Sequence, residues 1–197
     1  MRFSVIMPSR MIPYHNQASD PEMKLTRAIT SVMAQRFDDY ELIVIADGCE
    51  RTVEIAGEFK DVKVIKVVHK VLFDNVPRNA GIDAAKGDFI IYCDADDYWG
   101  PNHLQKIHDQ LDHYEWVWYN DIIFDNRSGD WIERACNIKS IGQCGTSNIC
   151  HSVKLKWQRP GYAHDYYFIQ QLLKNRSHTK IKTPEYYVCH IPGRYDL

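Results

Sequence analysis

Short apolar runs alternate with stretches of helical periodicity through the first half of the chain. Four runs rich in apolar and β-branched residues are each short enough to form one buried strand: 3–7, 41–46, 62–68 and 88–93. Between them, three stretches carry apolar residues at helical spacing: 25–34, 52–59 and 77–85. Regular alternation of this kind predicts a parallel sheet with helices on both faces.

The rhythm changes in the second half. A helix is expected from Pro101 to about His113, then two β-like runs at 115–119 and 122–125 and a turn at 126–129. Residues 136–150 contain Gly, Ser and Thr with weak periodicity, which predicts a loop region over a site, and an amphipathic helix follows at 166–173. No linker separates these parts. We therefore expect one α/β domain over 1–197, a Rossmann-like and mostly parallel sheet with a small antiparallel or loop extension in its C-terminal half.

Composition excludes several classes of protein. The 197 residues are 45% hydrophobic and 25% charged, which is typical of a folded domain rather than a disordered segment. The formal net charge of -2 gives no support to a chain-wide grip on nucleic acid. No stretch reaches the ~20 apolar residues of a membrane span. The six cysteines form no CxxC pair, so we expect reduced thiols in a cytoplasmic protein.

The strongest candidate for chemistry is the acidic turn Asp94-Ala95-Asp96-Asp97, which follows the fourth apolar run. Carboxylates this close raise one another's pKa unless a cation or hydrogen-bond donors offset them. Carboxylate oxygens suit hard ions such as Mg²⁺ or Mn²⁺, which also accept phosphate oxygens as ligands. The alternative is a solvated acidic turn, or an N-cap for the helix expected after Pro101.

Other polar residues are expected at the same edge of the sheet. Ser9 and Arg10 follow the first apolar run and Asp47 follows the second. Ligands of open α/β sheets bind outside the carboxyl ends of the strands, where these residues would meet the acidic turn.

The order of these motifs resembles a known enzyme family. The opening FSVIMPSR, the strand ELIVIADG, the segment Arg78-Asn79-Ala80-Gly81-Ile82 and the run IIYCDADDYW are similar to landmarks of family-2 glycosyltransferases of the GT-A fold, in the same order. The resemblance covers Arg2 to about Leu111 and thins out beyond. It implies a nucleotide-sugar-binding half over 1–100 and an acceptor-binding half with a C-terminal loop over 101–197.

The resemblance assigns donor-binding roles by position. Pro8, Ser9 and Arg10 look like the loop along the nucleotide, and Asp47 matches the aspartate that receives the uracil N–H in relatives using UDP-sugars. Ala46 departs from the family pattern, which often has a second acidic residue there. The remaining assignments follow from the third and fourth motifs: Arg78 and Asn79 flank the diphosphate and nucleoside, Asp94 and Ala95 face the nucleotide, and Asp96 is the direct metal ligand.

Two neighbours of the metal ligand are expected to be structural. Asp97 would start the following helix, and Trp99 would serve packing, as large aromatic side chains mostly do. For Arg78 the alternative is a surface residue that caps its own helix, although arginine is well suited to phosphate recognition.

The resemblance also places the catalytic groups. His164-Asp165 resembles the family's Glu-Asp pair before an aromatic, apolar helix, so Asp165 would be the general base and His164 would share or tune the proton transfer. The alternative for Asp165 is a helix cap. His190 resembles a late histidine that completes the metal shell in some relatives, and its alternative is a structural residue. Residues 144–148 would lie beneath the donor sugar and acceptor.

The sequence therefore predicts a Mn²⁺- or Mg²⁺-dependent inverting glycosyltransferase that moves a sugar from a nucleoside diphosphate sugar, with UDP favoured, to an acceptor hydroxyl. Two rivals stay open. A nucleotidyltransferase usually needs an early glycine-rich phosphate loop, and residues 8–17 contain no glycine. A sugar-nucleotide-binding module without turnover is the second. The acceptor class is also open, whether saccharide, lipid, protein or modified DNA base.

Overall fold

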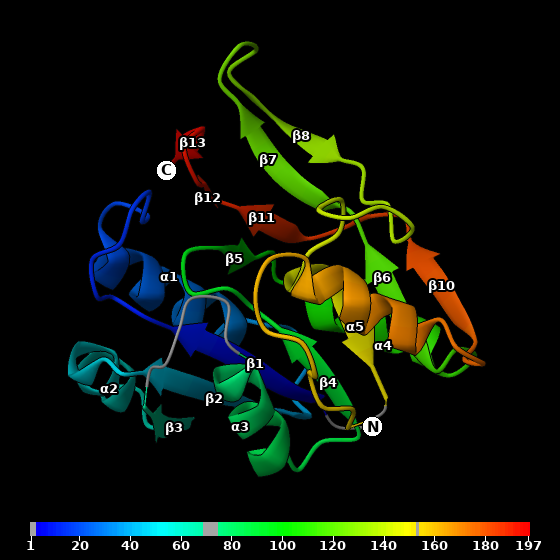
Figure 1. Cartoon of the computed structure of the whole chain (residues 1–197), viewed down its shortest axis with the longest axis horizontal. Helices are drawn as coiled ribbons and strands as arrows, with labels where there is room; N and C mark the ends of the chain where they lie inside the picture. The colour runs from blue at the N-terminus through cyan, green and yellow to red at the C-terminus, as the bar shows by residue number, and fades with distance from the viewer. Residues whose placement is uncertain (1–2, 69–74, 153) are drawn as a thin grey trace.

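A seven-stranded sheet forms the centre of the molecule. The computed structural model describes residues 3–68, 75–152 and 154–197. The strands run in the order β10-β6-β9-β4-β1-β2-β3 (Figure 1). β9 is antiparallel to both of its neighbours, whereas the other pairs are parallel. The bounds are β1 Phe3–Ser9, β2 Tyr40–Asp47, β3 Val62–Val67, β4 Phe89–Tyr92, β6 Trp116–Tyr119, β9 Ile149–His151 and β10 His178–Ile181.

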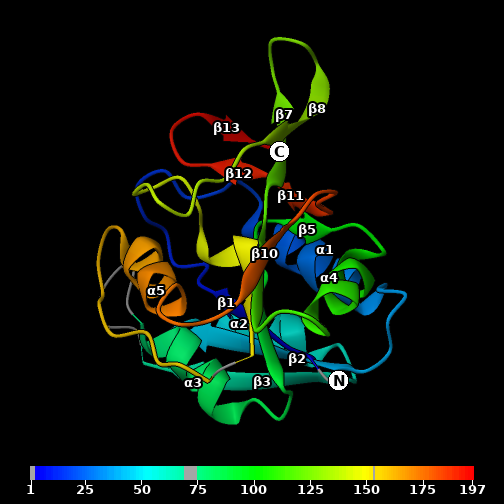
Figure 2. The ribbon, with the colours of Figure 1, turned by 90° about the vertical axis from the view of Figure 1, so that its right-hand side faces the viewer.

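Helices cover both faces of this sheet, as predicted (Figure 2). One core cluster joins α1, α2 and α4 to one face, and a second joins α3 and α5 to the other. The helix bounds are α1 Pro21–Met33, α2 Glu50–Gly57, α3 Val76–Ala84, α4 His103–Leu111 and α5 His164–Leu172. Among the described residues, no helix has the length and apolarity that a membrane crossing needs.

The side-chain alternation of β1 explains the two layers. Val5 and Met7 are fully buried beneath α1 and α2, while Ile6 is fully buried on the α3 side. A strand points successive side chains to opposite faces, so one continuous apolar run supplies both cores. Gly81 lets α3 approach closely, because a Cβ there would lie 2.6 Å from Cγ2 of Ile6.

A smaller four-stranded sheet lies above the main sheet in the view of Figure 1, with its strands in the order β5-β11-β7-β8. The β7–β8 hairpin projects from the body of the molecule (Figures 1 and 2). This extension also contains a C-terminal hairpin. The bounds are β5 Tyr98–Trp99, β7 Asp121–Asp125, β8 Asp130–Arg134, β11 Tyr186–Val188, β12 His190–Ile191 and β13 Tyr195–Asp196.

The structure corrects one predicted loop. Residues 136–150 were expected to be a loop, but Ile149 and Cys150 belong to β9, which fills the gap between β4 and β6. Both side chains are fully buried. A three-residue strand has too short a pattern to distinguish it from a loop, and long-range pairing decides its conformation.

Candidate functional site

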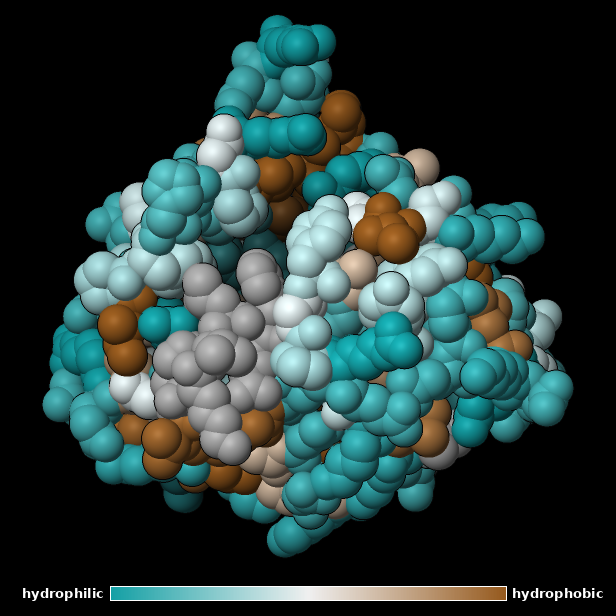
Figure 3. Space-filling view, in the orientation of Figure 1, coloured by the Kyte–Doolittle hydropathy of each residue, from teal (hydrophilic) through white to brown (hydrophobic). Residues whose placement is uncertain are grey.

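One cavity of about 630 Å³ lies at the carboxyl ends of β1, β2 and β4. The lower wall comes from these strands and α3, and the upper wall from the small sheet, η1 (Thr146–Asn148) and the C-terminal hairpin. In the space-filling view a recess with largely hydrophilic borders lies below the projecting hairpin (Figure 3). The position is the one expected for a ligand site in an open α/β sheet.

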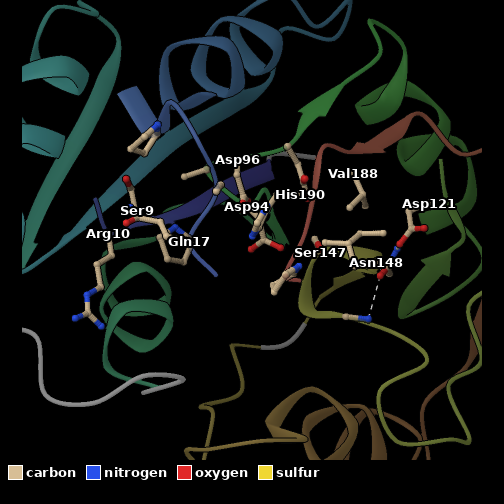
Figure 4. A pocket seen from close by; sticks show the side chains of 18 of the residues that line it. Ser9, Arg10, Gln17, Asp94, Asp96, Asp121, Ser147, Asn148, Val188 and His190 are labelled. Atoms are coloured by element: carbon tan, nitrogen blue, oxygen red, sulfur yellow. Dashed lines mark hydrogen bonds between the residues drawn. The ribbon is translucent and has the colours of Figure 1, made fainter. Parts of the chain in front are cut away.

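The acidic turn forms the floor of this cavity. Asp94, Ala95 and Asp96 all line it, and Figure 4 shows the side chains of Asp94 and Asp96 there. Both aspartates are half-buried. Burial raises the pKa of Asp94, although Arg78 and a hydrogen bond from Ser147 act in the opposite direction. Burial and the nearby Asp94 carboxylate raise the pKa of Asp96 to about 6. A cation at this floor would favour the ionised form of both carboxyls and so oppose the burial that raises these pKa values.

Asp97 does not start a helix, contrary to the prediction. α4 begins six residues later, at His103. The Asp97 carboxylate is buried and accepts hydrogen bonds from the Tyr186 hydroxyl at 2.7 Å and the Cys189 backbone N–H at 2.8 Å. Asp97 therefore ties the acidic turn to the small sheet. Trp99 is 3% exposed, which confirms its expected packing role.

Four residues expected on the donor side do line the cavity: Pro8, Ser9, Arg10 and Asp47. The Ser9 hydroxyl lies 3.1 Å from the Thr52 hydroxyl, so α2 helps to fix the end of β1. The Arg10 guanidinium lies over the Tyr14 ring, 5.9 Å from its centre. These residues come from the ends of neighbouring strands, as the parallel topology requires.

Arg78 and Asn79 are adjacent in α3 but have different surroundings. Arg78 lines the cavity, and its charge lowers the pKa of both Asp94 and Asp165. Asn79 does not reach the cavity. Its amide nitrogen donates to the Trp157 carbonyl at 3.0 Å, and its amide oxygen accepts from the Trp157 N–H at 2.8 Å. The Asn79 amide is thus bonded to a main-chain partner 78 positions away, and its predicted contact with the donor nucleotide stays a prediction.

Asp165 is the second residue of α5, and its carboxylate is held by two side chains. The Thr146 hydroxyl donates to Oδ1, and Nε2 of His164 lies 3.0 Å from the same oxygen. Burial alone would raise the pKa of Asp165, but the interactions with His164, Arg78 and Thr146 bring it below its ordinary value. Neither His164 nor Asp165 is part of the cavity wall, although the residues on each side of Thr146 are.

His190 lines the cavity near Asp96, and its charge acts to lower the pKa of that carboxyl. Both imidazole nitrogens face oxygen atoms: Nδ1 lies 3.2 Å from Oδ1 of Asp196, and Nε2 lies 2.9 Å from the Asn16 carbonyl. The side chain therefore links the C-terminal hairpin to the loop after β1. His190 could ligate a metal only by giving up one of these contacts, so its metal role stays a prediction.

An ion pair on the upper wall was missed in the sequence: a buried carboxylate faces a more exposed guanidinium. Asp121 is 1% exposed and accepts two hydrogen bonds from Arg134, at 2.8 and 2.5 Å. Asn148 donates to the same carboxylate at 3.3 Å (Figure 4). Asp121 and Arg134 are register partners across the β7–β8 hairpin. Pairing the two strands around the predicted turn at 126–129 would have placed these two charges opposite each other.

The carboxylate oxygens at the floor of the cavity are suitable ligands for a hard divalent metal ion. Asp94 and Asp96 supply carboxylate oxygens, and both have raised pKa values that a cation would lower. Within the described ranges, no group of three or more His, Cys, Asp or Glu side chains is arranged to hold a metal. A site with two carboxylates suits Mg²⁺ or Mn²⁺, because such ions keep water ligands and bind substrate phosphates.

Comparisons with known proteins agree with this arrangement. The model of "Glycosyl transferase family 2" matches residues 9–177, which is most of the chain. The uncharacterized glycosyltransferase YwdF of Bacillus subtilis is 27% identical over 53% of this chain and 40% of its own length. Poly(ribitol-phosphate) β-N-acetylglucosaminyltransferase TarS of Staphylococcus aureus is 29% identical over 50% of this chain and 17% of its own length.

A solved structure extends the likeness to the whole fold. The crystal structure of an S. aureus TarS fragment in complex with UDP-GlcNAc superposes with a TM-score of 0.77 at 18% identity, over 99% of this chain and 60% of that one. This chain thus spans about half or less of the curated relatives named above, and 60% of the solved fragment. The GT-A architecture is confirmed, and with its family model matched over residues 9–177 the chain belongs to glycosyl transferase family 2.

Proposed function

We propose that this protein transfers a sugar from a UDP-sugar to an acceptor hydroxyl, with inversion at the anomeric carbon and with Mn²⁺ or Mg²⁺ on the acidic turn. The observation that carries the proposal is the meeting of Asp94, Asp96 and Arg78 in one cavity, which Asp47 also lines. Two carboxylates for a metal and one guanidinium for phosphate oxygens suit a diphosphate. The UDP-GlcNAc complex of TarS, a protein with the same fold, supports UDP as the nucleotide.

Each group has a role in the proposed reaction. Arg78 would bind the diphosphate and stabilise the charge that grows on it as the sugar leaves. A metal held by Asp94 and Asp96 would neutralise the same charge. Asp165 would accept the proton of the acceptor hydroxyl, which requires its carboxylate to be ionised. The lowered pKa of Asp165 keeps it ionised at neutral pH.

The surroundings of Asp165 favour one alternative. Its Oδ1 is in contact with both Thr146 and His164, and the residue is not part of the cavity wall. A general base needs to reach the acceptor proton within hydrogen-bond distance, directly or through one water. The alternative is therefore a module that binds the nucleotide sugar without turnover. Such a module would bind UDP and the UDP-sugar as the proposed enzyme does. It would not release UDP from any UDP-sugar, whichever acceptor is added.

Thermal denaturation with nucleotides tests donor binding. A ligand that binds only the folded state raises Tm with its concentration and affinity. We expect UDP and UDP-GlcNAc to raise Tm in Mn²⁺ and to lose most of this effect in EDTA, whereas GDP has little effect. Asp96→Ala should abolish the part of this rise in Tm that depends on Mn²⁺.

A matched control is Asp130→Ala, which removes an exposed carboxylate on the hairpin, and its UDP shift should equal that of the wild type. A larger rise in Tm with GDP than with UDP would disprove the assignment of uracil as the nucleotide base. No shift with any nucleotide would overturn the proposed function. Release of UDP from UDP-GlcNAc, with water or a saccharide as acceptor, would then separate an enzyme from a binding module.

A further inference from the structure

Trp157 lies in the connection between β9 and α5, which has no regular secondary structure over residues 154–160. Its side chain is 3% exposed although the surrounding residues are mostly exposed or half-buried. One large aromatic side chain therefore anchors the segment that leads into the helix of Asp165. No motif in the sequence distinguishes this tryptophan from the other four.

The main chain of Trp157 is fixed to α3. Asn79 binds both its N–H, at 2.8 Å, and its carbonyl, at 3.0 Å. A side-chain amide that satisfies both groups of one residue holds that residue in position and orientation. The segment before α5 is thereby attached to the residue next to Arg78.

The indole ring connects three further elements. Its N–H donates to the Tyr92 hydroxyl at 3.1 Å, and Tyr92 ends the strand that leads into the acidic turn. One ring face stacks on Phe168 of α5, with centroids 4.0 Å apart and planes 11° apart. The His164 ring lies 5.6 Å away in an edge-on arrangement. The first turns of α5 are therefore packed directly on this ring.

Arg78 also depends on the ring. Its guanidinium carbon lies 5.4 Å from the centre of the Trp157 ring. Within the described ranges, the buried Nε of Arg78 makes no hydrogen bond. A cation over an aromatic face is attracted by the ring quadrupole, most strongly by tryptophan. The Trp157 ring is thus a contact that helps to orient the Arg78 side chain at the cavity edge.

We propose that Trp157 is a positioning residue that sets the place of Arg78 and of the His164–Asp165 turn relative to each other. The inference rests on the proposed function, because in that reaction Arg78 binds the diphosphate and Asp165 is the general base. Trp157 itself is not part of the cavity wall. It fixes the distance between the group that binds the leaving diphosphate and the group that accepts the proton, and catalysis is sensitive to such placement.

The test uses a matched pair of tryptophans. Trp116 is fully buried in the same core cluster, and its ring contact is with His178. Trp157→Leu and Trp116→Leu therefore remove the same side chain from the same core. We expect similar falls in Tm for both variants. Only Trp157→Leu should weaken UDP binding in Mn²⁺, by about 5- to 30-fold on the strength of a desolvated cation–π contact.

Kinetics give the second readout, at a temperature well below both Tm values. We expect kcat for UDP release to fall about 10- to 100-fold in Trp157→Leu and to stay within about twofold of the wild type in Trp116→Leu. Trp157→Phe keeps an aromatic face beneath Arg78 and should recover most of the UDP affinity. Equal UDP affinity and equal kcat in the two leucine variants would overturn the inference. If Trp157→Leu does not fold, the same comparison between Trp157→Phe and Trp116→Phe decides, with the larger kinetic loss expected for Trp157→Phe.

Hydrogen exchange of the ligand-free proteins separates this inference from the proposed function. Trp157→Phe should speed exchange of the Tyr167 amide, which bonds the Ala163 carbonyl, and of the Asn79 amide, which bonds the Asn75 carbonyl. Trp116→Phe should leave both amides unchanged. Absence of UDP binding by the wild type would refute the proposed function, whereas unchanged exchange at both amides would refute the positioning role whether or not UDP binds.

Discussion

The carboxylate of Asp97 accepts a 2.7 Å hydrogen bond from the hydroxyl of Tyr186, which lies 89 positions later in the chain. Both side chains are buried, and the Tyr186 hydroxyl also accepts from the Asp94 backbone N–H at 3.1 Å. β11, which contains Tyr186, continues into the segment with Cys189 and His190. This contact therefore fixes the floor of the cavity to its upper wall.

Replacement of Asp97 should separate the need for a hydrogen-bond acceptor at this position from the need for a charge. Asp97→Ala leaves the Tyr186 hydroxyl and the Cys189 N–H buried without this acceptor, so we expect a loss of about 1–3 kcal/mol in the free energy of unfolding. Asp97→Asn keeps one acceptor oxygen and removes a charge from the acidic turn, so its loss should be much smaller. Urea denaturation measures both. Equal losses would show that the charge of Asp97 is what matters.

Asp165→Asn tests the base. The variant keeps the size of the side chain but cannot accept the acceptor proton, so we expect kcat for sugar transfer to fall about 100- to 10,000-fold. UDP affinity by calorimetry should stay unchanged, because Asp165 lies outside the cavity wall. In the wild type, the lowered pKa of Asp165 predicts no loss of kcat from this group between about pH 8 and about pH 5. Wild-type turnover by the variant would contradict the assignment.

The raised pKa of Asp96 predicts a specific dependence of stability on pH. In the metal-free protein, the pKa rises from 3.8 to about 6, so between these values the folded state binds this proton more tightly than the unfolded chain does. The stabilising contribution of the protonated carboxyl is therefore lost as pH rises through about 6. Asp96→Asn does not titrate, so its Tm should fall less than that of the wild type between about pH 5 and about pH 7.

Metal addition gives the complementary measurement. A metal binds the ionised carboxylate, so the gain in wild-type Tm from Mn²⁺ should be larger at about pH 7 than at about pH 5. Asp96→Asn should show little gain at either pH. Parallel curves of Tm against pH for the two proteins without metal would contradict the raised pKa.

The Asp121–Arg134 pair should show strong energetic coupling. Arg134→Met leaves a buried carboxylate with a weakened set of donors, so we expect a loss of about 1–3 kcal/mol. The double variant with Asp121→Asn should lose less than the sum of the two single losses, because the charge that needs Arg134 is gone. Arg127→Met, at the exposed tip of the same hairpin, is the control for removal of a positive charge. Additive losses would mean that the pair contributes nothing as a pair.

The sequence alone determined the first four strands of the main sheet, β1 to β4, and the floor of the site. Strand and helix periodicities are local, and they were correct for the strands and helices of the first half, with shifts of a few residues at the ends. The parallel topology then brings the ends of β1, β2 and β4 to one edge, so Ser9, Asp47 and Asp96 could be placed together without coordinates.

Tertiary structure decided what local patterns do not contain. The partner of Asp97 is 89 positions away and the partner of Asn79 is 78 positions away, so neither side chain shows its role in its own segment. β9 is a strand only because β4 and β6 leave room for it. Trp157 reads as one more core tryptophan in the sequence. Its place between Arg78 and α5 exists only once distant segments pack, because contacts among side chains far apart in sequence are set by the fold.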